Sequence, residues 1–205
     1  MNISYAVTAY NEHVELKSLL DNIIPILRFY DELVIQLDTR ATQDVRDLVY
    51  NIPKNNSKSI RVIEYDLNND FASFKNNLKK NCNKDYIFFI DADELISDQL
   101  ASSINYILDN NNIDLYWVPR INTVEGLTEE HVIKWGWRVD ENGRVNYPDS
   151  QSRIVRNIPP IKWVNKVHER LVGAITEIEL PEGYDLLHHK TIERQEKQNL
   201  FYSNL

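Results

Sequence analysis

The sequence has 205 residues, of which 42% are hydrophobic and 26% are charged, and its formal net charge at pH 7 is -8. This composition is that of an ordinary soluble globular protein, and it excludes a disordered chain, a collagen-like repeat and a disulfide-stapled module. A chain of this length can bury roughly 70% of the surface that its unfolded form exposes, so it needs no covalent staple.

Cysteine usage and the N-terminal sequence bear on the compartment. Cys82 is the only cysteine, which leaves no internal disulfide and no cysteine-rich zinc site. The opening MNISYAVTAYNE lacks the basic start and long apolar run of a signal peptide, and no stretch of about 18 apolar residues could span a bilayer. We therefore expect a cytoplasmic protein. The acidic balance also argues against a protein that coats nucleic acid.

Short apolar runs alternate with helical patterns over the first half of the chain, which predicts an α/β fold with a mostly parallel sheet flanked by helices. In each helical pattern the apolar residues recur at a spacing of three to four. Pro25 should kink or end the first helix, and Ser97 is a suitable N-cap for the last. The expected strands are residues 3–9, 33–37, 60–65 and 86–90, and the expected helices are residues 16–27, 44–50, 71–82 and the segment after Ser97.

The sequence changes in character after Asn112. One more strand is expected over residues 114–120, and then strands and loops up to a polar, helix-prone tail that begins at residue 191. We expect one domain over residues 1–205, with a cofactor-binding half (1–112) and an aromatic-rich half (113–205) that shapes a second ligand site. In the alternative, the tryptophans of the second half only fill the core. These tryptophans are Trp117, Trp135, Trp137 and Trp163.

Two acids follow the most apolar strand. The run YIFFI, residues 86–90, is uninterrupted and predicts a strand buried on both faces. Asp91 and Asp93 come next, and because residues two apart in an extended chain share a face, their carboxylates should project together. Such a pair shares either a proton or a cation, and oxygen ligands of this kind favour Mg²⁺ or Mn²⁺ bound together with phosphate. In the alternative the acids only cap the next helix, but ligands bind at the carboxyl ends of parallel strands.

Three further polar segments occupy comparable positions along the chain. They are TAYNE (residues 8–12), Asp38 followed by TRATQD (39–44), and a Lys-Asn pair (75–76) on the helix before the strand that ends in DADE (91–94). In this order the segments resemble the motifs of the family-2 glycosyltransferases over roughly residues 1–100. They are similar above all to those of short bacterial enzymes that add sugars to lipopolysaccharide cores and other surface glycans.

The resemblance implies a Rossmann-like glycosyltransferase A fold and an inverting, metal-assisted transfer from a nucleotide-diphosphate sugar, with a UDP-sugar favoured and Mn²⁺ or Mg²⁺ as the metal. It implies that Asp91 faces the ribose and the metal, that Asp93 is the principal metal ligand, and that Asp38 meets the base or the ribose. Taken singly, Asn and Asp at strand ends are also common turn formers. The other residues that the resemblance places around the nucleotide are Thr8, Ala9, Asn11, Glu12, Lys75 and Asn76.

The second half matches a further pattern of these short enzymes, in YPDSQSR (147–153), Trp163, VHE (167–169) and LHH (187–189). Direct displacement needs a base for the acceptor hydroxyl. We choose Glu169, which follows a short apolar strand and has His168 beside it, with Asp149 as the second candidate; the alternative for Glu169 is an exposed surface pair. The Glu-Asp pair and the Gln-x-x-Arg-Trp motif of processive members are absent, which leaves the base open.

Two histidines and two tryptophans carry further hypotheses. His188 can complete the metal site, since an imidazole can join a carboxylate on Mn²⁺, or it is a core histidine beside His189. Trp135 and Trp137 would face the same way in an extended chain and could stack on a glycan or glycolipid acceptor, or they belong to a loop core. A lipid-linked acceptor would bring peripheral membrane contact, although no strongly basic amphipathic stretch is present.

Two rival functions remain at this point. A sugar nucleotidyltransferase shares the α/β sheet and the acidic ligands, but it would carry a glycine-rich, basic loop after the first strand, where this chain has residues 8–12 without glycine or a basic side chain. A non-catalytic nucleotide-sugar-binding module of the same fold is the second rival. The donor base, the sugar, the acceptor and whether the chain is part of a longer protein stay open.

Overall fold

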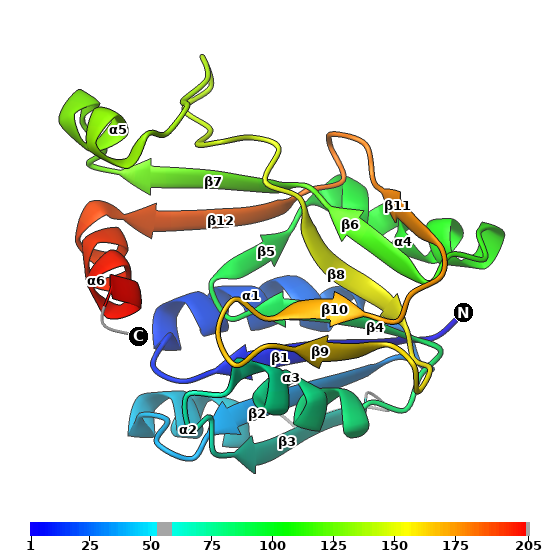
Figure 1. The fold of residues 1–205 in the computed structure, drawn as a ribbon. Helices are drawn as coiled ribbons and strands as arrows, with labels where there is room; N and C mark the ends of the chain where they lie inside the picture. Colours follow the sequence, from blue (N-terminus) through cyan, green and yellow to red (C-terminus); the bar gives the residue numbers. More distant parts are fainter. Residues whose placement is uncertain (53–58, 204–205) are drawn as a thin grey trace.

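The structure is a computed structural model that describes residues 1–52 and 59–203. Its largest element is a seven-stranded sheet (Figure 1). The strands are β1 (Ile3–Ala9), β2 (Glu32–Asp38), β3 (Ser59–Tyr65), β4 (Tyr86–Asp91), β6 (Leu115–Val118), β8 (Gln151–Arg156) and β11 (Glu177–Glu179). Their order is β11-β6-β8-β4-β1-β2-β3, so three strands of the second half extend the sheet that the first half begins.

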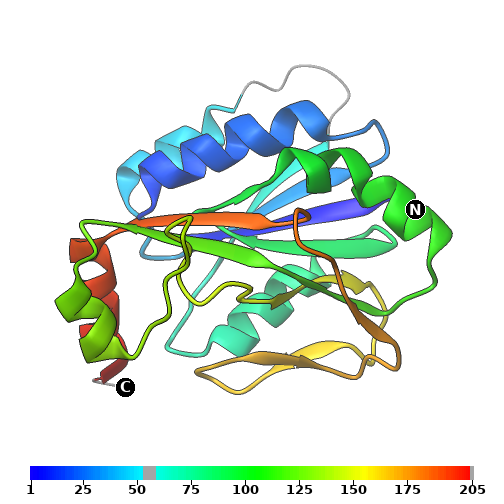
Figure 2. The same cartoon turned by 90° about the horizontal axis from the view of Figure 1, so that it is seen from above.

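The first four strands are parallel to one another, and β8 is antiparallel to both β4 and β6. Helices α1 (His13–Ile26), α2 (Gln43–Tyr50) and α4 (Asp98–Asn110) cover one face of the sheet, and α3 (Phe71–Lys80) lies on the other (Figure 2). The expected mostly parallel sheet flanked by helices is confirmed. Because β1, β2 and β4 run in one direction, their carboxyl ends meet at one edge, where the acids of the sequence motifs lie.

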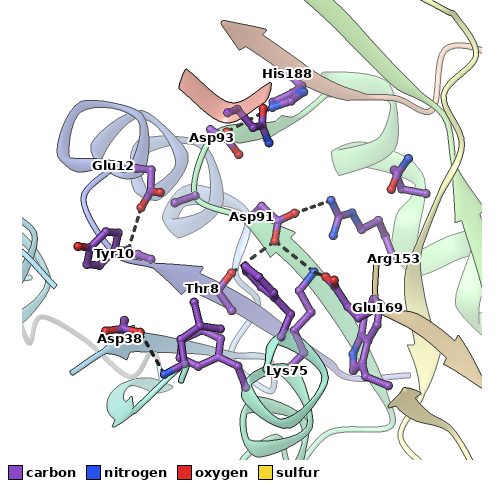
Figure 3. Close-up of a pocket in the computed structure, with 18 of the residues that line it drawn as sticks. Thr8, Tyr10, Glu12, Asp38, Lys75, Asp91, Asp93, Arg153, Glu169 and His188 are labelled. Carbon is purple, nitrogen blue, oxygen red and sulfur yellow. Dashed lines mark hydrogen bonds and ion pairs between the residues drawn. The ribbon is translucent and has the colours of Figure 1, made fainter. Parts of the chain in front are cut away.

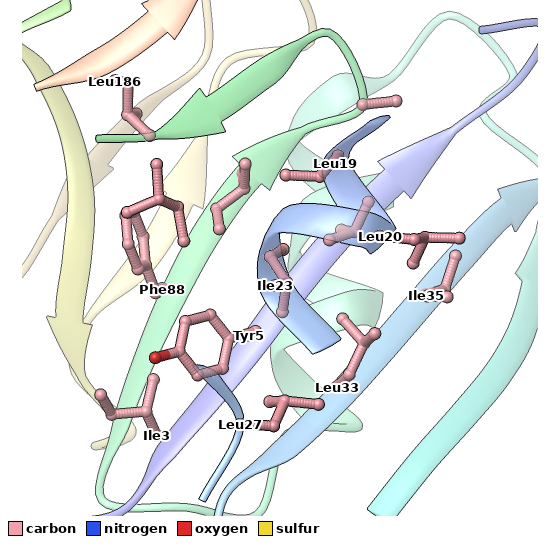
Figure 4. Close-up of a cluster of buried hydrophobic side chains, with 14 of the residues drawn as sticks. Ile3, Tyr5, Leu19, Leu20, Ile23, Leu27, Leu33, Ile35, Phe88 and Leu186 are labelled. Carbon is pink, nitrogen blue, oxygen red and sulfur yellow. The ribbon is translucent and has the colours of Figure 1, made fainter. Parts of the chain in front are cut away.

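The apolar run of β4 is buried on both faces of the sheet, as expected. Tyr5 and Phe88 point to the side of α1, in a cluster with Leu19 and Ile23 (Figure 4). The residues that alternate with them face α3: Ile87 and Phe89 pack in a second cluster that also contains Leu78 and Trp163. The period-two alternation of a strand therefore divides one continuous apolar sequence between two cores.

A smaller sheet continues from the end of β4. It consists of β5 (Glu94–Ile96), β12 (Leu186–Thr191) and β7 (Arg120–Glu125), in the order β5-β12-β7. A two-stranded ribbon of β9 (Lys162–Val164) and β10 (Arg170–Val172) lies beside α3 (Figure 1). The chain ends in α6 (Ile192–Ser203), which directly follows β12. The second half thus surrounds the carboxyl edge of the first.

Two expectations for the second half need correction. The strand expected over residues 114–120 is interrupted at Pro119, which lacks a backbone N–H, and the chain passes there from β6 in the large sheet to β7 in the small one. The stretch expected to hold only strands and loops also contains α5 (Glu129–Trp135). This helix begins with a capping box in which Thr128 and His131 bond reciprocally, a local signal that outweighs its weak apolar period.

The N-cap expected at Ser97 is confirmed, since its hydroxyl accepts from the backbone N–H of Leu100 at 3.3 Å. Pro25 lies inside the last turn of α1, which ends one residue later at Ile26. Among the helices of the described ranges, none combines the length and the apolar character that a bilayer crossing demands.

The two-sided burial of β4 predicts a large effect of truncating one of its aromatic side chains. Phe88 is 0% exposed, and its ring centroid lies 6.0 Å from that of Tyr5. Phe88→Ala should lower the free energy of unfolding by about 3–5 kcal/mol in urea titrations. Tyr106→Ala, on α4 at a position that is 73% exposed, is the control and should change it by no more than about 0.5 kcal/mol. Equal effects of the two substitutions would contradict the assignment of the core.

Candidate active site

A cavity of about 530 Å³ opens at the carboxyl ends of β1, β2 and β4 (Figure 3). Its walls come from both halves of the chain. Residues of the first half that line it include Thr8, Ala9, Tyr10, Glu12, Asp38, Lys75, Asp91 and Asp93, and residues of the second half include Arg120, Arg153, Trp163, Glu169, His188 and Lys190. The predicted sites at three strand ends are therefore parts of one concave site.

Asp91 ends β4 and is held by cations. Its Oδ2 accepts from Arg153 Nη2 at 2.7 Å, Lys75 Nζ lies 3.6 Å from its Oδ1, and the Thr8 hydroxyl lies 3.4 Å from Oδ1. Burial would raise the pKa of Asp91, but the charges of Arg153 and Lys75 outweigh it and hold that pKa well below its usual range. Asp91 is thus an ionised carboxylate whose charge the protein already balances.

Glu94 holds both Asp91 and Arg153 in place. Its side chain is fully buried, and its Oε1 accepts from Arg153 at 2.6 Å and from Arg120 at 3.1 Å. Its other oxygen accepts from the backbone N–H of Asp91 at 3.1 Å. Sequence reasoning missed Glu94 and Arg120 as site residues. The sequence offered one sign of Glu94, because this acid directly follows the Asp-Ala-Asp triplet. No local pattern marks Arg120, whose partners lie 26 or more positions away along the chain.

Asp93 faces a different partner on the same side of the cavity. His188 Nε2 lies 3.3 Å from its Oδ2 (Figure 3). Arg194 Nη2 lies 3.2 Å from the same oxygen. Burial would raise the pKa of Asp93, but its contact with the His188 ring outweighs this and lowers it to about 2. The two neighbouring acids therefore have different partners: Asp91 contacts Arg153 and Lys75, whereas Asp93 contacts His188 and Arg194.

The pair of Asp93 and His188 has the donor chemistry for a divalent ion. Oxygen and imidazole nitrogen are ligands that Mn²⁺ accepts, and metal–ligand bonds of about 2.1 Å place adjacent ligands about 3 Å apart, close to the separation of the two atoms here. Within residues 1–52 and 59–203, no cluster of three or more Asp, Glu, His or Cys side chains could hold a metal. The pair therefore fits an ion only together with ligands from substrate or water.

The remaining residues expected around the nucleotide take different positions. Asp38 lines the cavity and accepts from the side chain of Arg40 at 2.9 Å and from the Leu67 backbone N–H at 3.1 Å. Glu12 shapes the loop after β1, because its Oε2 accepts from the N–H groups of Tyr10 and Asn11. Asn11 is exposed and is not part of the cavity wall.

Asn76 is not part of the cavity wall either. Its amide exchanges two hydrogen bonds with the backbone of Trp163, at 2.8 and 2.9 Å, and so ties α3 to β9. Trp163 is 4% exposed and packs edge-on against Phe89, with Lys75 Nζ 4.7 Å from its ring centre. Asn76 and Trp163 thus hold the wall of the cavity on which Lys75 lies.

The two candidate bases differ in how their carboxylates are engaged. Glu169 lines the cavity, and its Oε1 accepts from Lys75 Nζ at 2.7 Å. Asp149 lies outside that cavity, and its carboxylate accepts from Arg120, Asn122 and Gln151 at 2.6 to 3.1 Å. Burial raises the pKa of Asp149, but these donors together lower it. Of the two candidates, Glu169 is therefore the one whose carboxylate lines the main cavity.

A second cavity of about 230 Å³ adjoins the first. His188, Arg120 and Lys190 line both, and Trp137 lines only the second. The rings of Trp137 and Trp135 are tilted against each other with centroids 4.7 Å apart, and Trp135 is also stacked on His131 at 5.1 Å. Trp135 is thus engaged by other rings of the protein, and of the two tryptophans only Trp137 lines the second cavity.

Comparisons with known proteins agree with this geometry. The model of a family described as glycosyl transferase family 2 matches residues 4–163. A search among curated proteins returned no significant match. Among solved structures, TarS 1–349 from S. aureus in complex with UDP-GlcNAc has a TM-score of 0.68 at 15% identity, over 93% of this chain and 59% of that chain. The same fragment with UDP has a TM-score of 0.67 at 15% identity, over 92% and 60%.

A mannosyltransferase from Pyrobaculum calidifontis in complex with GDP-Man and Mn²⁺ matches with a TM-score of 0.47 at 21% identity, over 58% of this chain and 35% of that chain. The present chain thus spans about 60% of the length of the TarS fragment. The likeness to TarS establishes the fold, which is the glycosyltransferase A fold expected from the sequence.

The ion pairs around Arg153 predict a specific loss of stability. Arg153→Met should leave Asp91 and Glu94 without their shared cation and lower the free energy of unfolding by about 3–5 kcal/mol at pH 7. Lys17→Met, which removes an exposed ion pair with Asp21, is the control and should cost at most about 1 kcal/mol.

The same variant has a predictable pH dependence. Because the pKa of Asp91 is lowered by folding, its contribution is present above the unfolded pKa, near 4, and is lost as the pH falls further. Arg153→Met lacks this contribution. The difference in the free energy of unfolding between the wild-type protein and Arg153→Met should therefore become smaller as the pH falls from 6 toward about 3. A difference that is constant over this range would contradict the ion-pair origin.

Proposed function

The chain belongs to glycosyl transferase family 2, and we propose from this premise that its large cavity binds a nucleotide-diphosphate sugar and transfers the sugar to a hydroxyl group with inversion. The observation that carries the proposal is the separation of roles at the end of β4. Asp91 is paired with Arg153 and Lys75, while Asp93 faces the ring of His188 and has Arg194 beside it.

In this proposal Asp93 and His188 hold a divalent ion, Mn²⁺ or Mg²⁺. When bound, the ion offsets the charge of the diphosphate and stabilises it as the leaving group. Asp91 was also expected to bind the metal. Since its charge is already compensated, we assign it to the ribose side of the cavity, where Thr8 lies beside it. Arg194 and Lys190, which lie near Asp93, add positive charge on the side of the phosphates.

The nucleotide end of the cavity is assigned to the loop after β1 and the end of β2. Arg40 and the Leu67 N–H fix the carboxylate of Asp38, which can then accept from a base N–H or a ribose hydroxyl. Thr8, Ala9 and Glu12 form the adjoining wall. Because TarS, which shares the fold, is solved with UDP-GlcNAc, a UDP-sugar is our first choice of donor.

Glu169 is assigned as the base. Displacement requires that the acceptor hydroxyl loses its proton while its oxygen attacks the anomeric carbon and the bond to the diphosphate breaks. Glu169 can accept that proton inside the cavity, and the 2.7 Å contact with Lys75 holds its carboxylate in place. Lys75 also lies 3.6 Å from Asp91, so one buried lysine positions the proposed base relative to the donor side.

The acceptor is proposed to be a glycan or a glycolipid. The second cavity, which shares His188 and Arg120 with the first, offers amide groups and one face of Trp137, a combination that suits sugar rings. A lipid-linked acceptor would place the protein at the inner face of a membrane through peripheral contact.

The metal assignment can be tested by thermal shift with UDP, GDP and CDP. A diphosphate should raise the melting temperature of the wild-type protein only when Mn²⁺ is present, because the ligand stabilises the folded state that binds it. Asp93→Ala should abolish this shift, and Asp47→Ala, an exposed acid on α2, should retain it. A shift that survives both EDTA and Asp93→Ala would refute the metal role. Release of pyrophosphate from a nucleoside triphosphate and sugar phosphate would instead indicate a nucleotidyltransferase.

The base assignment predicts a split between chemistry and binding. Glu169→Gln keeps the size of the side chain and a contact to Lys75, but it cannot take a proton, so kcat should fall about 100-fold or more. The affinity for the nucleotide, measured by calorimetry, should change by less than about threefold. Glu141→Gln at an exposed turn serves as control and should behave as wild type. Undiminished turnover in Glu169→Gln would return the assignment to another residue.

A further inference from the structure

Asp149, the second candidate base, begins a chain of hydrogen bonds whose directions can be assigned. Its Oδ2 accepts from Arg120 Nη2 at 2.6 Å, and its Oδ1 accepts from Gln151 at 2.9 Å. A carboxylate held by an arginine in this way is ionised and has only acceptor atoms. Any neighbour that bonds to it must therefore present a donor.

Asn122 is that neighbour. Its Nδ2 lies 2.8 Å from Asp149 Oδ2. Since only the amide nitrogen can donate, the orientation of the Asn122 side chain is settled, and its Oδ1 must point the other way. That oxygen lies 2.7 Å from His188 Nδ1. Asn122 and His188 are direct partners in the parallel ladder of β7 and β12, which keeps the two side chains in register.

The orientation of Asn122 determines the proton position on His188. An amide oxygen accepts but cannot donate, so Nδ1 of His188 must carry a proton. In the neutral ring Nε2 is then unprotonated, and its lone pair faces Asp93 Oδ2 at 3.3 Å (Figure 3). Two acceptors at this distance need either a proton or a metal ion between them. The opposite tautomer would donate from Nε2 to Asp93 and close the site to a metal.

We propose that Asp149 is a positioning residue which acts through Asn122 to fix the Nδ1–H tautomer of His188, and so keeps Nε2 free as a metal ligand. The inference rests on the metal-dependent function proposed above and deepens it. Metal-ligating histidines commonly donate their other ring N–H to a fixed acceptor, and loss of that acceptor typically weakens metal binding 10- to 100-fold.

The same chain continues beyond Asp149 to the other acid of the motif. Arg120 bonds both Asp149 and Glu94, and Arg153 bonds both Glu94 and Asp91. Donors and acceptors therefore alternate from Asp91 to His188 without a break. In this network Asp149 accepts from Arg120, Asn122 and Gln151 and does not line the main cavity, so its proposed role differs from that of Glu169.

The test measures the affinity of the metal-free protein for Mn²⁺ alone, by the electron paramagnetic resonance signal of free Mn²⁺. Asn122→Leu keeps the side-chain volume but removes the acceptor for Nδ1–H, and it should weaken Mn²⁺ binding about 10- to 100-fold. Thr123→Val is the matched control. It removes the 2.9 Å bond between Thr123 and His189, the next pair in the same ladder, and should leave Mn²⁺ affinity unchanged.

A charge swap distinguishes the hydrogen-bond relay from simple packing. In the double variant Asn122→Asp with Asp149→Asn, the new carboxylate can accept from His188 Nδ1 while the new amide donates to it, so the proton stays on Nδ1. This variant should bind Mn²⁺ within about threefold of wild type. Weak binding by the double variant, equal to that of Asn122→Leu, would overturn the relay.

The tautomer itself is visible in the ¹⁵N shifts of the His188 ring, measured without metal at a pH where the ring is neutral. The wild-type ring should be protonated at Nδ1 and the Asn122→Leu ring at Nε2. A wild-type ring protonated at Nε2, or equal Mn²⁺ affinity of wild type and Asn122→Leu, would overturn the inference and leave the proposed function intact. If the wild-type protein binds no Mn²⁺ at all, the metal role of Asp93 and the relay fall together.

Discussion

The whole site depends on the compensation of negative charge at the end of a buried strand. Two acids of the motif and Glu94 lie where an apolar strand leaves the core, and desolvation there penalises every ionised carboxylate. This penalty is offset by Arg153, which is buried and forms ion pairs with both Asp91 and Glu94. Asp91 is thereby fixed at the cavity wall by its ion pair with Arg153, whereas Asp93 contacts His188 and Arg194.

The two halves of the chain contribute unequal chemistry to the cavity. The first supplies most of the carboxylates, and the second supplies Arg153, Arg120 and His188. The family match ends at residue 163, so Glu169, His188 and the helix that carries Arg194 lie beyond it. Glu169 lies between the two strands of the β9–β10 ribbon and His188 lies on β12 of the small sheet, and both line the main cavity together with the acids of the first half. Strands β6 and β8 continue the sheet begun by β1 to β4. The expected boundary near residue 112 is crossed by the central sheet, and the division into two functional halves remains a prediction.

The sequence predicted the parts of the fold that depend on local rules. The alternation of strands and helices, the burial of β4 and the convergence of Asp38, Asp91 and Asp93 follow from periodicity and from the geometry of parallel strands. The contacts of Arg120 with Glu94 and Asp149 and of Asn122 with His188 could not be predicted, because they join residues that lie 26 to 66 positions apart in the sequence. The short helix α5 was missed although its signal is local, because a capping box marks its start and its apolar residues show no clear helical period.

The continuous alternation of donors and acceptors from Asp91 to His188 constrains how this protein can diverge. Substitution of one residue of the network leaves the charge or the lone pair of its neighbour without a partner. Tolerated substitutions should therefore occur in compensating pairs, which would be seen as covariation between positions that are distant in the sequence. Engineering of acceptor preference is better directed at the walls that lie outside this network, such as Trp137 in the second cavity. Side chains there can change one at a time without unbalancing the electrostatics of the scaffold.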